Sequence, residues 1–483
     1  MKPTVLRLIG LIGLLSVFLF SFSVPTLSAD SPLPSVSSES GATVPSESDD
    51  RPTGTTGSPA DDPTSDSSTD TTTGSQTESA ATESTTHRPG TSSSGTGGTG
   101  RPSTGVTISP TTPSGPSPAP TPTPAGRIVA GYYGGWAAYK GYTPQRIPAD
   151  KLTHLHYAFA KIDPTQNRIA LADPAQDRKN FAALRQLKQK NPQLKTLISI
   201  GGWDYSTYFS DIASTAARRD SFARSIVDFL LEHGFDGVDL DWEYPVSGGL
   251  SGNTNRPQDK QNFTLLLRAI RERLDEQGRR DGRRYYLTIA GAANSGYLSR
   301  IEPQRVAELV DYIFVMTYDM HGPWDSYADL NAPLYTPQEN APQYKASVSD
   351  GIRAYLQKGV SADKLVLGMP FYGYVYEGVS AQNNGLYSRF SSAKSVSYDT
   401  LRSAYLNNRV YTRLYHSTAR VPYLYGNNTF ISYEDADSIA AKVSLAKSMK
   451  LAGIGIWELS HDTSGTLLSA AWRALHGRQA HFG

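Results

Sequence analysis

From residue 126 onward, short runs of β-branched and aromatic residues alternate with longer segments of helical periodicity. Eight such runs over about 350 residues predict an α/β fold, a (β/α)8 TIM barrel in which each strand is followed by a covering helix. A doubly wound open sheet is the alternative fold. The predicted strands are 128–134, 152–160, 195–201, 234–242, 285–291, 312–318, 364–370 and 453–458, and the main predicted helices are 178–190, 217–232, 259–276, 344–358, 437–449 and 464–475.

The connection between the seventh and eighth predicted strands is too long for one helix. Within it, residues 374–431 are rich in Tyr and Asn. We expect a small inserted α+β subdomain at 374–431, beside the mouth of the barrel. That position matters because the functional residues of such barrels lie at the C-terminal ends of the strands.

The first 125 residues follow a different pattern. Residues 1–29 combine Lys2 and Arg7 with an apolar run and small residues up to Ala29, which predicts a signal peptide cleaved after Ala29. An uncleaved membrane anchor is the alternative, but the apolar run is shorter than the roughly 20 residues of a spanning helix. Residues 30–125 are rich in Ser, Thr, Pro and Gly and lack aromatic residues, so they cannot bury enough apolar area to fold. We predict a disordered linker at 30–125, a catalytic barrel at 126–483 and a secreted, extracellular protein.

Charge and cysteine content exclude several classes of protein. The 46 Lys and Arg residues nearly balance the 45 Asp and Glu residues, so no strong basic field favours nucleic acid as a partner. The chain has no Cys, which excludes disulfides, thiolate zinc sites and cysteine nucleophiles. We expect a monomer that binds no nucleic acid and has no membrane contact once the leader is removed.

The segment 235–245, with the sequence Phe-Asp-Gly-Val-Asp-Leu-Asp-Trp-Glu-Tyr-Pro, concentrates acidic residues in one predicted strand. Because side chains alternate along a strand, Asp239, Asp241 and Glu243 share one face, with successive side chains about 7 Å apart. Val238, Leu240 and Trp242 share the other face, which suits packing against outer helices. Three carboxyl groups in a confined space cannot all ionise, so at least one should hold a proton near neutral pH, as a general acid must.

Two other interpretations of this acidic strand stay open, a structural acid cluster and a divalent-metal site. The first is costly because the strand supplies no Lys or Arg to neutralise the buried acids. Asp236 has the opposite parity, so its role is less certain.

The spacing Asp236-x-x-Asp239-x-Asp241-x-Glu243 resembles the DxxDxDxE signature of the chitinases of glycoside hydrolase family eighteen. Other segments resemble that family in the same order along the chain. These are 131–136 (GYYGGW), 199–203 (SIGGW), 316–319 (MTYD) with 321–324 (HGPW), and 455–458 (GIWE). The resemblance covers residues 126 to about 478.

The resemblance implies a retaining hydrolysis in which the acetamido group of the substrate replaces a protein nucleophile. Glu243 would protonate the glycosidic oxygen, Asp241 would hold the acetamido N–H, and Asp239 would share a proton with Asp241. Tyr318 would donate a hydrogen bond to the acetamido oxygen, with support from Asp319. No cofactor and no metal ion are implied.

Aromatic side chains at strand ends can stack on the C–H faces of sugars. By resemblance, Trp457 would form the floor of the subsite in which the sugar distorts. The other candidate substrate-binding residues are Tyr132, Trp136, Phe159, Trp203, Tyr244, Met316 and Trp324. The family also tends to have non-proline cis peptide bonds near strand ends, here expected at Ala158–Phe159 and Trp457–Glu458.

One position departs from the family pattern. Many relatives carry Arg after the segment 370–373 (PFYG), where this chain has Tyr374. If that Arg contacts the sugar or the residue matching Asp319 in relatives, the contact is altered here.

Together these features predict a secreted, endo-acting, retaining chitinase whose substrate is chitin or a chito-oligosaccharide with β-1,4-linked N-acetylglucosamine units. An enzymatic alternative is an endo-N-acetylglucosaminidase that acts on peptidoglycan or on the core of N-glycans. A non-enzymatic alternative is a chitin-binding lectin on the same barrel. Non-catalytic relatives typically lose the acid, whereas Glu243 is present in this chain.

Overall fold

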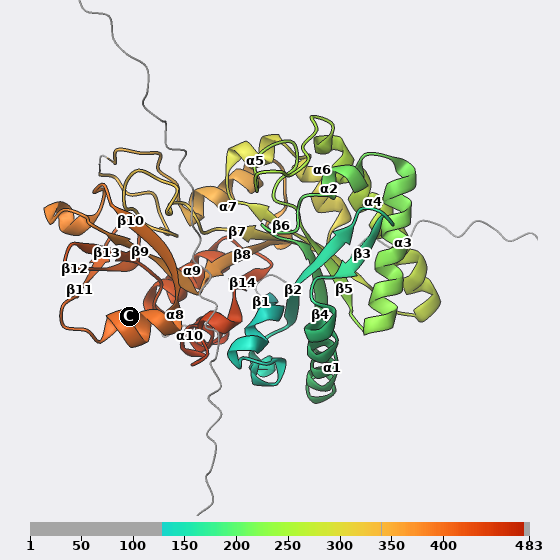
Figure 1. The fold of residues 1–483 in the computed structure, drawn as a ribbon, viewed down its shortest axis with the longest axis horizontal. Coiled ribbons are helices and arrows are strands. Elements are labelled where there is room, and N and C mark those ends of the chain that lie inside the picture. The colour runs from blue at the N-terminus through green and yellow to red at the C-terminus, as the bar shows by residue number, and fades with distance from the viewer. Residues whose placement is uncertain (1–127, 340, 478–483) are drawn as a thin grey trace, which may run out of the picture. The chain divides into compact units, whose positions relative to one another are not determined.

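The computed structural model describes residues 128–339 and 341–477 of the chain. The predicted signal peptide at 1–29 and the predicted linker at 30–125 lie outside these residues. Eight parallel strands form a closed barrel in the order β1-β14-β8-β7-β6-β5-β4-β2, and β1 pairs with β2 to complete the ring (Figure 1). The predicted TIM barrel is therefore confirmed, and the open sheet is excluded. The barrel strands are β1 (Ile128–Gly134), β2 (His154–Asp163), β4 (Lys195–Gly201), β5 (Gly237–Asp241), β6 (Tyr286–Ala292), β7 (Tyr312–Met316), β8 (Leu365–Pro370) and β14 (Gly453–Trp457).

Helices surround the barrel and connect its strands (Figure 1). A short extra strand, β3 (Arg168–Leu171), pairs antiparallel with the end of β2 and was not predicted, because its four residues show little alternation. In the part of the chain that the structure describes, no helix has both the length and the apolar character needed to cross a membrane. The α-helices are α1 (Pro174–Lys190), α2 (Phe209–Ala213), α3 (Ala216–His233), α4 (Asp259–Asp281), α5 (Ser295–Ser299), α6 (Pro303–Leu309), α7 (Val348–Gln357), α8 (Tyr398–Thr400), α9 (Ala436–Ser448) and α10 (Thr466–His476).

Side-chain caps fix the ends of the main helices. Asp173 and Thr215 accept the hydrogen bonds that start α1 and α3, and a reciprocal capping box between Asp435 and Ser438 starts α9. Gly234 ends α3 in the left-handed conformation, with φ 78°. The predicted strand 234–242 therefore began too early, since its first residue is a helix cap and β5 begins at Gly237.

Large and small side chains alternate inside the barrel. Phe314 of β7 fills the interior, and an added Cβ at Gly455 or Gly368 would lie only 2.2 or 2.9 Å from its ring. On the outside of β5, Trp242 stacks on Phe209 of α2 at 5.3 Å and meets Phe263 of α4 edge-to-face at 5.5 Å. The outward face of the acidic strand is thus packed against helices, as its alternation predicted.

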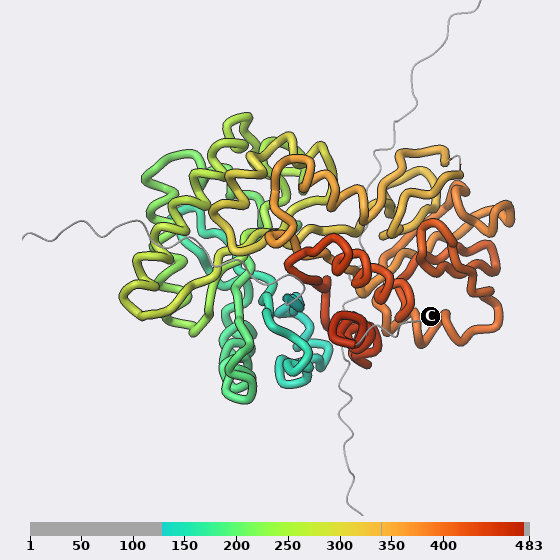
Figure 2. Tube along the Cα trace, turned by 180° about the vertical axis from the view of Figure 1, so that it is seen from behind, coloured from blue at the N-terminus to red at the C-terminus, as the bar shows by residue number. Residues whose placement is uncertain are grey.

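A second sheet is inserted between β8 and β14, as predicted. It is antiparallel, in the order β10-β9-β13-β12-β11, and it lies on one side of the barrel, whereas α3 and α4 lie on the other (Figures 1 and 2). Only Phe371 separates β8 from β9, so the inserted sheet starts directly at the C-terminal end of a barrel strand. The inserted strands are β9 (Tyr372–Glu377), β10 (Ser392–Ser397), β11 (Thr412–His416), β12 (Val421–Gly426) and β13 (Thr429–Ser432).

Candidate active site

Asp239 lies at the centre of a hydrogen-bonded layer inside the barrel. The strand register places it beside Ser199 of β4 and Thr288 of β6, so all three side chains point inward. Ser199 donates to Asp239 Oδ2 at 2.9 Å and Thr288 to Oδ1 at 2.6 Å, while the Tyr132 hydroxyl from β1 donates to Oδ2 at 2.8 Å. Asp239 is fully buried, and its polar partners come from three different strands.

A histidine also faces Asp239. His156 of β2 places Nδ1 3.4 Å from Asp239 Oδ2, and its Nε2 lies 2.6 Å from the Tyr312 hydroxyl. Burial by itself would raise the pKa of Asp239, but His156 and the hydrogen bonds from Thr288 and Tyr132 outweigh it and lower the pKa. Asp239 is therefore a carboxylate in the protein without substrate.

Asp241 is the next inward residue of β5, and its environment lacks the hydrogen-bond partners that surround Asp239. The residue is buried, and no hydrogen bond from the described part of the chain reaches its Oδ1. Burial, followed by the nearby charges of Glu243 and Asp239, raises the pKa of Asp241 well above its ordinary value. Neighbouring carboxyl groups with opposite pKa shifts can share a proton, with Asp241 as its holder.

Glu243 lies two residues beyond the end of β5 and is half-buried. Its backbone N–H donates to Ser206 Oγ at 2.9 Å, and its carbonyl accepts from Asn253 Nδ2 at 3.0 Å. Burial raises the pKa of Glu243 to about 7; the Tyr244 phenol acts in the opposite direction, and the charge of Asp319 adds to the increase. Glu243 can therefore hold a proton in neutral solution, as a general acid requires.

Two glycines after β4 allow the site to close around Asp241. Gly201 and Gly202 have φ values of 106° and 71°, a region that other residues rarely adopt. An added Cβ at Gly201 would lie 2.2 Å from the Asp241 carbonyl oxygen, and one at Gly202 would lie 2.5 Å from the Phe159 ring. The turn thus brings Ser206 back to Asp241. The Ser206 hydroxyl donates a hydrogen bond to the backbone carbonyl of Asp241 at 3.1 Å.

Asp319 follows β7 and has a left-handed backbone, with φ 55°. Its N–H donates to Asn331 Oδ1 at 2.8 Å, and its Oδ1 accepts from Tyr372 at 2.5 Å and from Tyr374 at 2.7 Å. The residue is open to solvent, yet protein atoms crowd its carboxyl group. This partial desolvation raises the pKa of Asp319, and the two tyrosine hydrogen bonds oppose the increase.

A group of aromatic rings lies around Trp457, at the end of β14. The half-buried indole of Trp457 stacks on Phe159 at 5.8 Å and lies 5.4 Å from the ring of Tyr132, while Trp136 lies 6.3 Å from Phe159. Tyr132 is only 1% exposed, so it supports this group from below and offers little surface to a ligand. Ala158–Phe159 and Trp457–Glu458 are cis, as expected, and Glu243–Tyr244 is cis as well.

The remaining candidates lie at the ends of other barrel strands. Tyr318 is buried, and burial together with the charge of Asp241 raises the pKa of its phenol. Met316 and Tyr244 are half-buried, and the Tyr244 ring meets Tyr297 edge-to-face at 5.9 Å. Trp203 and Trp324 are 48% and 61% exposed, and among the described residues no ring contact joins Trp203 to the group around Trp457.

Several residues that support these side chains were not predicted. His156 and Thr288 face inward on predicted strands, so strand parity could have found them. Asn331 lies in a loop and Tyr372 at the start of the inserted sheet, and neither carries a sequence signal for contact with Asp319.

Asp236, the first acidic residue of the signature, lies away from the other three. It accepts from the backbone N–H of Thr196 at 2.8 Å and pairs with Lys188 of α1 at 2.6 Å and with Arg283 at 3.4 Å. These contacts tie the start of β5 to its neighbours, which is a structural role.

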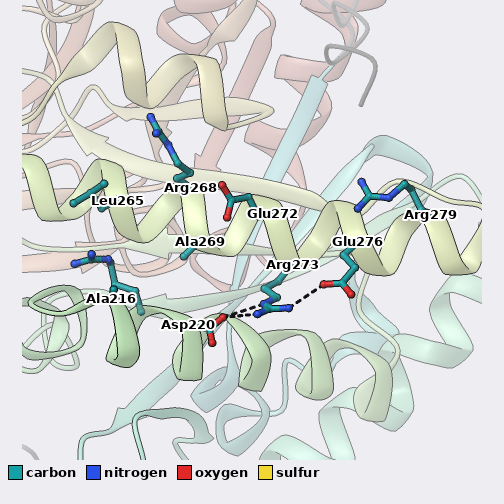
Figure 3. A pocket seen from close by; sticks show the side chains of 10 residues that line it. Ala216, Asp220, Leu265, Arg268, Ala269, Glu272, Arg273, Glu276 and Arg279 are labelled. Atoms are coloured by element: carbon teal, nitrogen blue, oxygen red, sulfur yellow. Dashed lines mark hydrogen bonds and ion pairs between the residues drawn. The ribbon is translucent and has the colours of Figure 1, made fainter. Parts of the chain in front are cut away.

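A surface hollow of about 520 Å³ lies between α3 and α4, outside the barrel (Figure 3). Arg273 crosses it and pairs with Asp220 at 2.7 Å and with Glu276 at 2.9 Å. None of the predicted site residues lines this hollow, and its charged groups largely neutralise one another.

Comparisons with known proteins identify the family of the chain. The family model described as glycosyl hydrolases family 18 matches residues 128–462. Chitinase A1 of Niallia circulans is 44% identical over 398 residues, which cover 70% of this chain and 57% of that protein, so the chain spans little more than half of its length. Chitinase ChiA74 from Bacillus thuringiensis superposes with a TM-score of 0.68 at 35% identity, over 72% of this chain and 69% of that one. An N-acetylglucosaminidase of the same family from Paenibacillus barengoltzii superposes with a TM-score of 0.66 at 36% identity, over 72% of this chain and 99% of that one. The chain therefore belongs to glycosyl hydrolase family 18.

Proposed function

We propose that this protein is a secreted chitinase that hydrolyses internal β-1,4 bonds of N-acetylglucosamine polymers. The reaction retains the configuration of the anomeric carbon. The observation that carries the proposal is the series Asp239, Asp241 and Glu243 on and just beyond β5, in which the first carboxyl group has a lowered pKa, the second a raised pKa and the third a pKa of about 7. The aromatic rings around Trp457 and the similarity to chitinases support a sugar polymer as the substrate.

In the proposed reaction, Glu243 donates its proton to the glycosidic oxygen as the bond to the anomeric carbon breaks. The carbonyl oxygen of the substrate's own acetamido group forms a new bond to that carbon, which gives an oxazolinium ion and releases the leaving sugar. Water then attacks the same carbon and transfers a proton to the Glu243 carboxylate, while the bond from that carbon to the acetamido oxygen breaks and the acetamido group is restored. Two displacements at one carbon retain its configuration.

The two aspartates act on the acetamido group in this scheme. Asp241 accepts the acetamido N–H and stabilises the positive charge that develops on the ring, while its own proton moves toward Asp239. Tyr318 donates to the acetamido oxygen, and Asp319 lies beside it. Trp457 supplies the apolar floor on which the distorted sugar stacks.

Replacing the proposed acid tests the activity directly. We expect Glu243→Gln to lower kcat on soluble chitin oligomers by roughly 10²–10⁴-fold, because the amide has no proton to donate. Asp241→Asn should lose rate to a similar extent while it keeps its affinity for the oligomers. Full turnover by Glu243→Gln would refute the catalytic assignment, and a lectin would show binding with no hydrolysis by the unmodified protein.

Products and substrates separate the enzymatic alternatives. Internal cleavage releases oligomers of several lengths, whereas an exo-acting N-acetylglucosaminidase releases the monosaccharide from the first turnover. Parallel assays on peptidoglycan and on a glycoprotein with N-linked glycans test the endo-N-acetylglucosaminidase alternative.

A further inference from the structure

The inserted sheet reaches the barrel site at one carboxylate. Tyr372 and Tyr374 are two residues apart on β9, so their side chains leave the same face of the strand, and both hydroxyls donate to Oδ1 of Asp319. In the described residues no hydrogen bond or ion pair is found for Oδ2 of Asp319. The two tyrosines therefore hold one oxygen and leave the other available to a ligand.

A second connection from the inserted sheet holds the backbone of Asp319. Ser432 of β13 pairs with Tyr374 in the sheet, and its hydroxyl accepts from the Asn331 N–H at 2.8 Å. Asn331 in turn accepts the N–H of Asp319. A left-handed backbone is unfavourable for a residue with a side chain, so such neighbours are needed to maintain it.

Tyr374 has a second contact that Tyr372 lacks. Its ring meets the indole of Trp324 edge-to-face, with the ring centres 5.8 Å apart. Trp324 is 61% exposed; its indole lies over Gly322 and, among the described residues, meets one other ring, that of Tyr374. One residue thus contacts both a carboxylate of the site and an exposed aromatic side chain beside it.

We propose that Tyr374 is a positioning residue, whose hydroxyl fixes the carboxylate of Asp319 for the reaction and whose ring supports Trp324 against the substrate. The inserted sheet is then part of the catalytic apparatus. This inference rests on the proposed function, since it assigns support roles for that same reaction.

The nature of the contact also affects the proton donor. The charge of Asp319 raises the pKa of Glu243 and of neighbouring phenols, and none of the ion pairs in the described part of the chain includes Asp319. A phenol holds the carboxylate without neutralising it, and the remaining negative charge helps to keep the pKa of Glu243 high.

The hydroxyl is tested with Tyr374→Phe. We expect kcat on chitin oligomers to fall roughly 10-fold with little change in KM, because the ring that supports Trp324 remains. Tyr374→Ala should lower kcat and also raise KM, since Trp324 loses its support. The matched control is Tyr376→Phe on the same strand, whose buried hydroxyl has no hydrogen-bond partner in the described residues and whose loss should leave both constants unchanged.

A charge-changing variant provides a readout that a purely structural role would not move. Tyr374→Arg places a cation beside Asp319, so the alkaline limb of the kcat/KM profile should shift to lower pH as the pKa of Glu243 falls. Thermal unfolding of each variant establishes that it is folded. If Tyr374→Arg does not fold, the kinetics of Tyr374→Phe decide the inference.

Wild-type kinetics for Tyr374→Phe, or an equal loss in Tyr376→Phe, would overturn the inference. A crystal structure of Tyr374→Phe in which Asp319 keeps its position would do the same without reference to activity. If the unmodified protein fails to cleave any chitin oligomer, the proposed function is what fails, and the position of Asp319 in that crystal structure still tests the contact.

Discussion

Asp239 and Asp241 are identical side chains two residues apart on one strand, yet their pKa values shift in opposite directions. Their direction into the barrel follows from strand parity and was predicted from the sequence. The difference between them was not predictable, because it depends on partners such as His156 and Thr288, which reach Asp239 from other strands. Sequence reasoning therefore identified the acids but could not identify which one is stabilised as a carboxylate.

The pKa of Glu243 gives a prediction at the same scale. A general acid works only while protonated, so kcat/KM on soluble oligomers should fall as pH rises through about 7. Asp319→Asn removes a negative charge that helps to raise the pKa of Glu243. The fall of kcat/KM at alkaline pH should therefore move to lower pH, and the maximal kcat/KM will be smaller. The measurement is the pH profile of kcat/KM for both proteins, and a limb that stays in place would contradict the assigned interaction.

At the scale of the element, β5 divides its acidic residues between its two ends. Asp236 ties the start of the strand to Lys188 and Arg283, and Glu243 follows its end. We expect Asp236→Asn to destabilise the fold by about 1–3 kcal/mol, because the Thr196 N–H loses a charged acceptor and the partly exposed Lys188 and Arg283 lose their counterpart, while kcat/KM stays unchanged.

The test of Asp236→Asn compares thermal unfolding with oligomer kinetics. Its matched control is Glu377→Gln, which breaks the ion pair with Lys394 on the surface of the inserted sheet. The side chain of Glu377 is 47% exposed against 10% for Asp236, so this change should cost at most about 1 kcal/mol. Loss of activity in Asp236→Asn without loss of stability would show that the residue serves the reaction after all.

The elements that sequence reasoning predicted well are those with a local signal. Each of the eight barrel strands was predicted, and the errors lie at ends such as Gly234, where a helix cap resembles the start of a strand. The contact of Tyr372 and Tyr374 with Asp319 could not be predicted from the sequence. It joins residues more than 50 positions apart, and the two tyrosines lie at the start of an insertion of irregular composition. The inserted subdomain was predicted from its length, but its function as a support for the site requires the structure.

At the scale of the whole molecule, the residues from 128 onward form a complete barrel by themselves. β1 closes the ring through hydrogen bonds to β2 and β14, and the N–H of Ile128 donates to Ala452 at 3.1 Å. The sequence predicts that residues 30–125 cannot form a core, which lowers the average hydrophobic content of the chain to 38%. Stability and oligomer cleavage should therefore both reside in residues 126–483.

A chain that starts at residue 126 tests this division. We expect the same thermal midpoint and the same kcat/KM on soluble oligomers as the full chain, because the removed residues are predicted to form no core. A chain that starts at residue 135 is the control: it lacks β1, leaves the edges of β2 and β14 unpaired, and should not fold. Each kcal/mol of lost stability would lower the thermal midpoint by about 2 °C for a domain of this size. A stabilising contribution of a few kcal/mol from residues 1–125 would therefore be measurable. A drop of several degrees in the chain that starts at 126 would show that the predicted linker contributes to the fold.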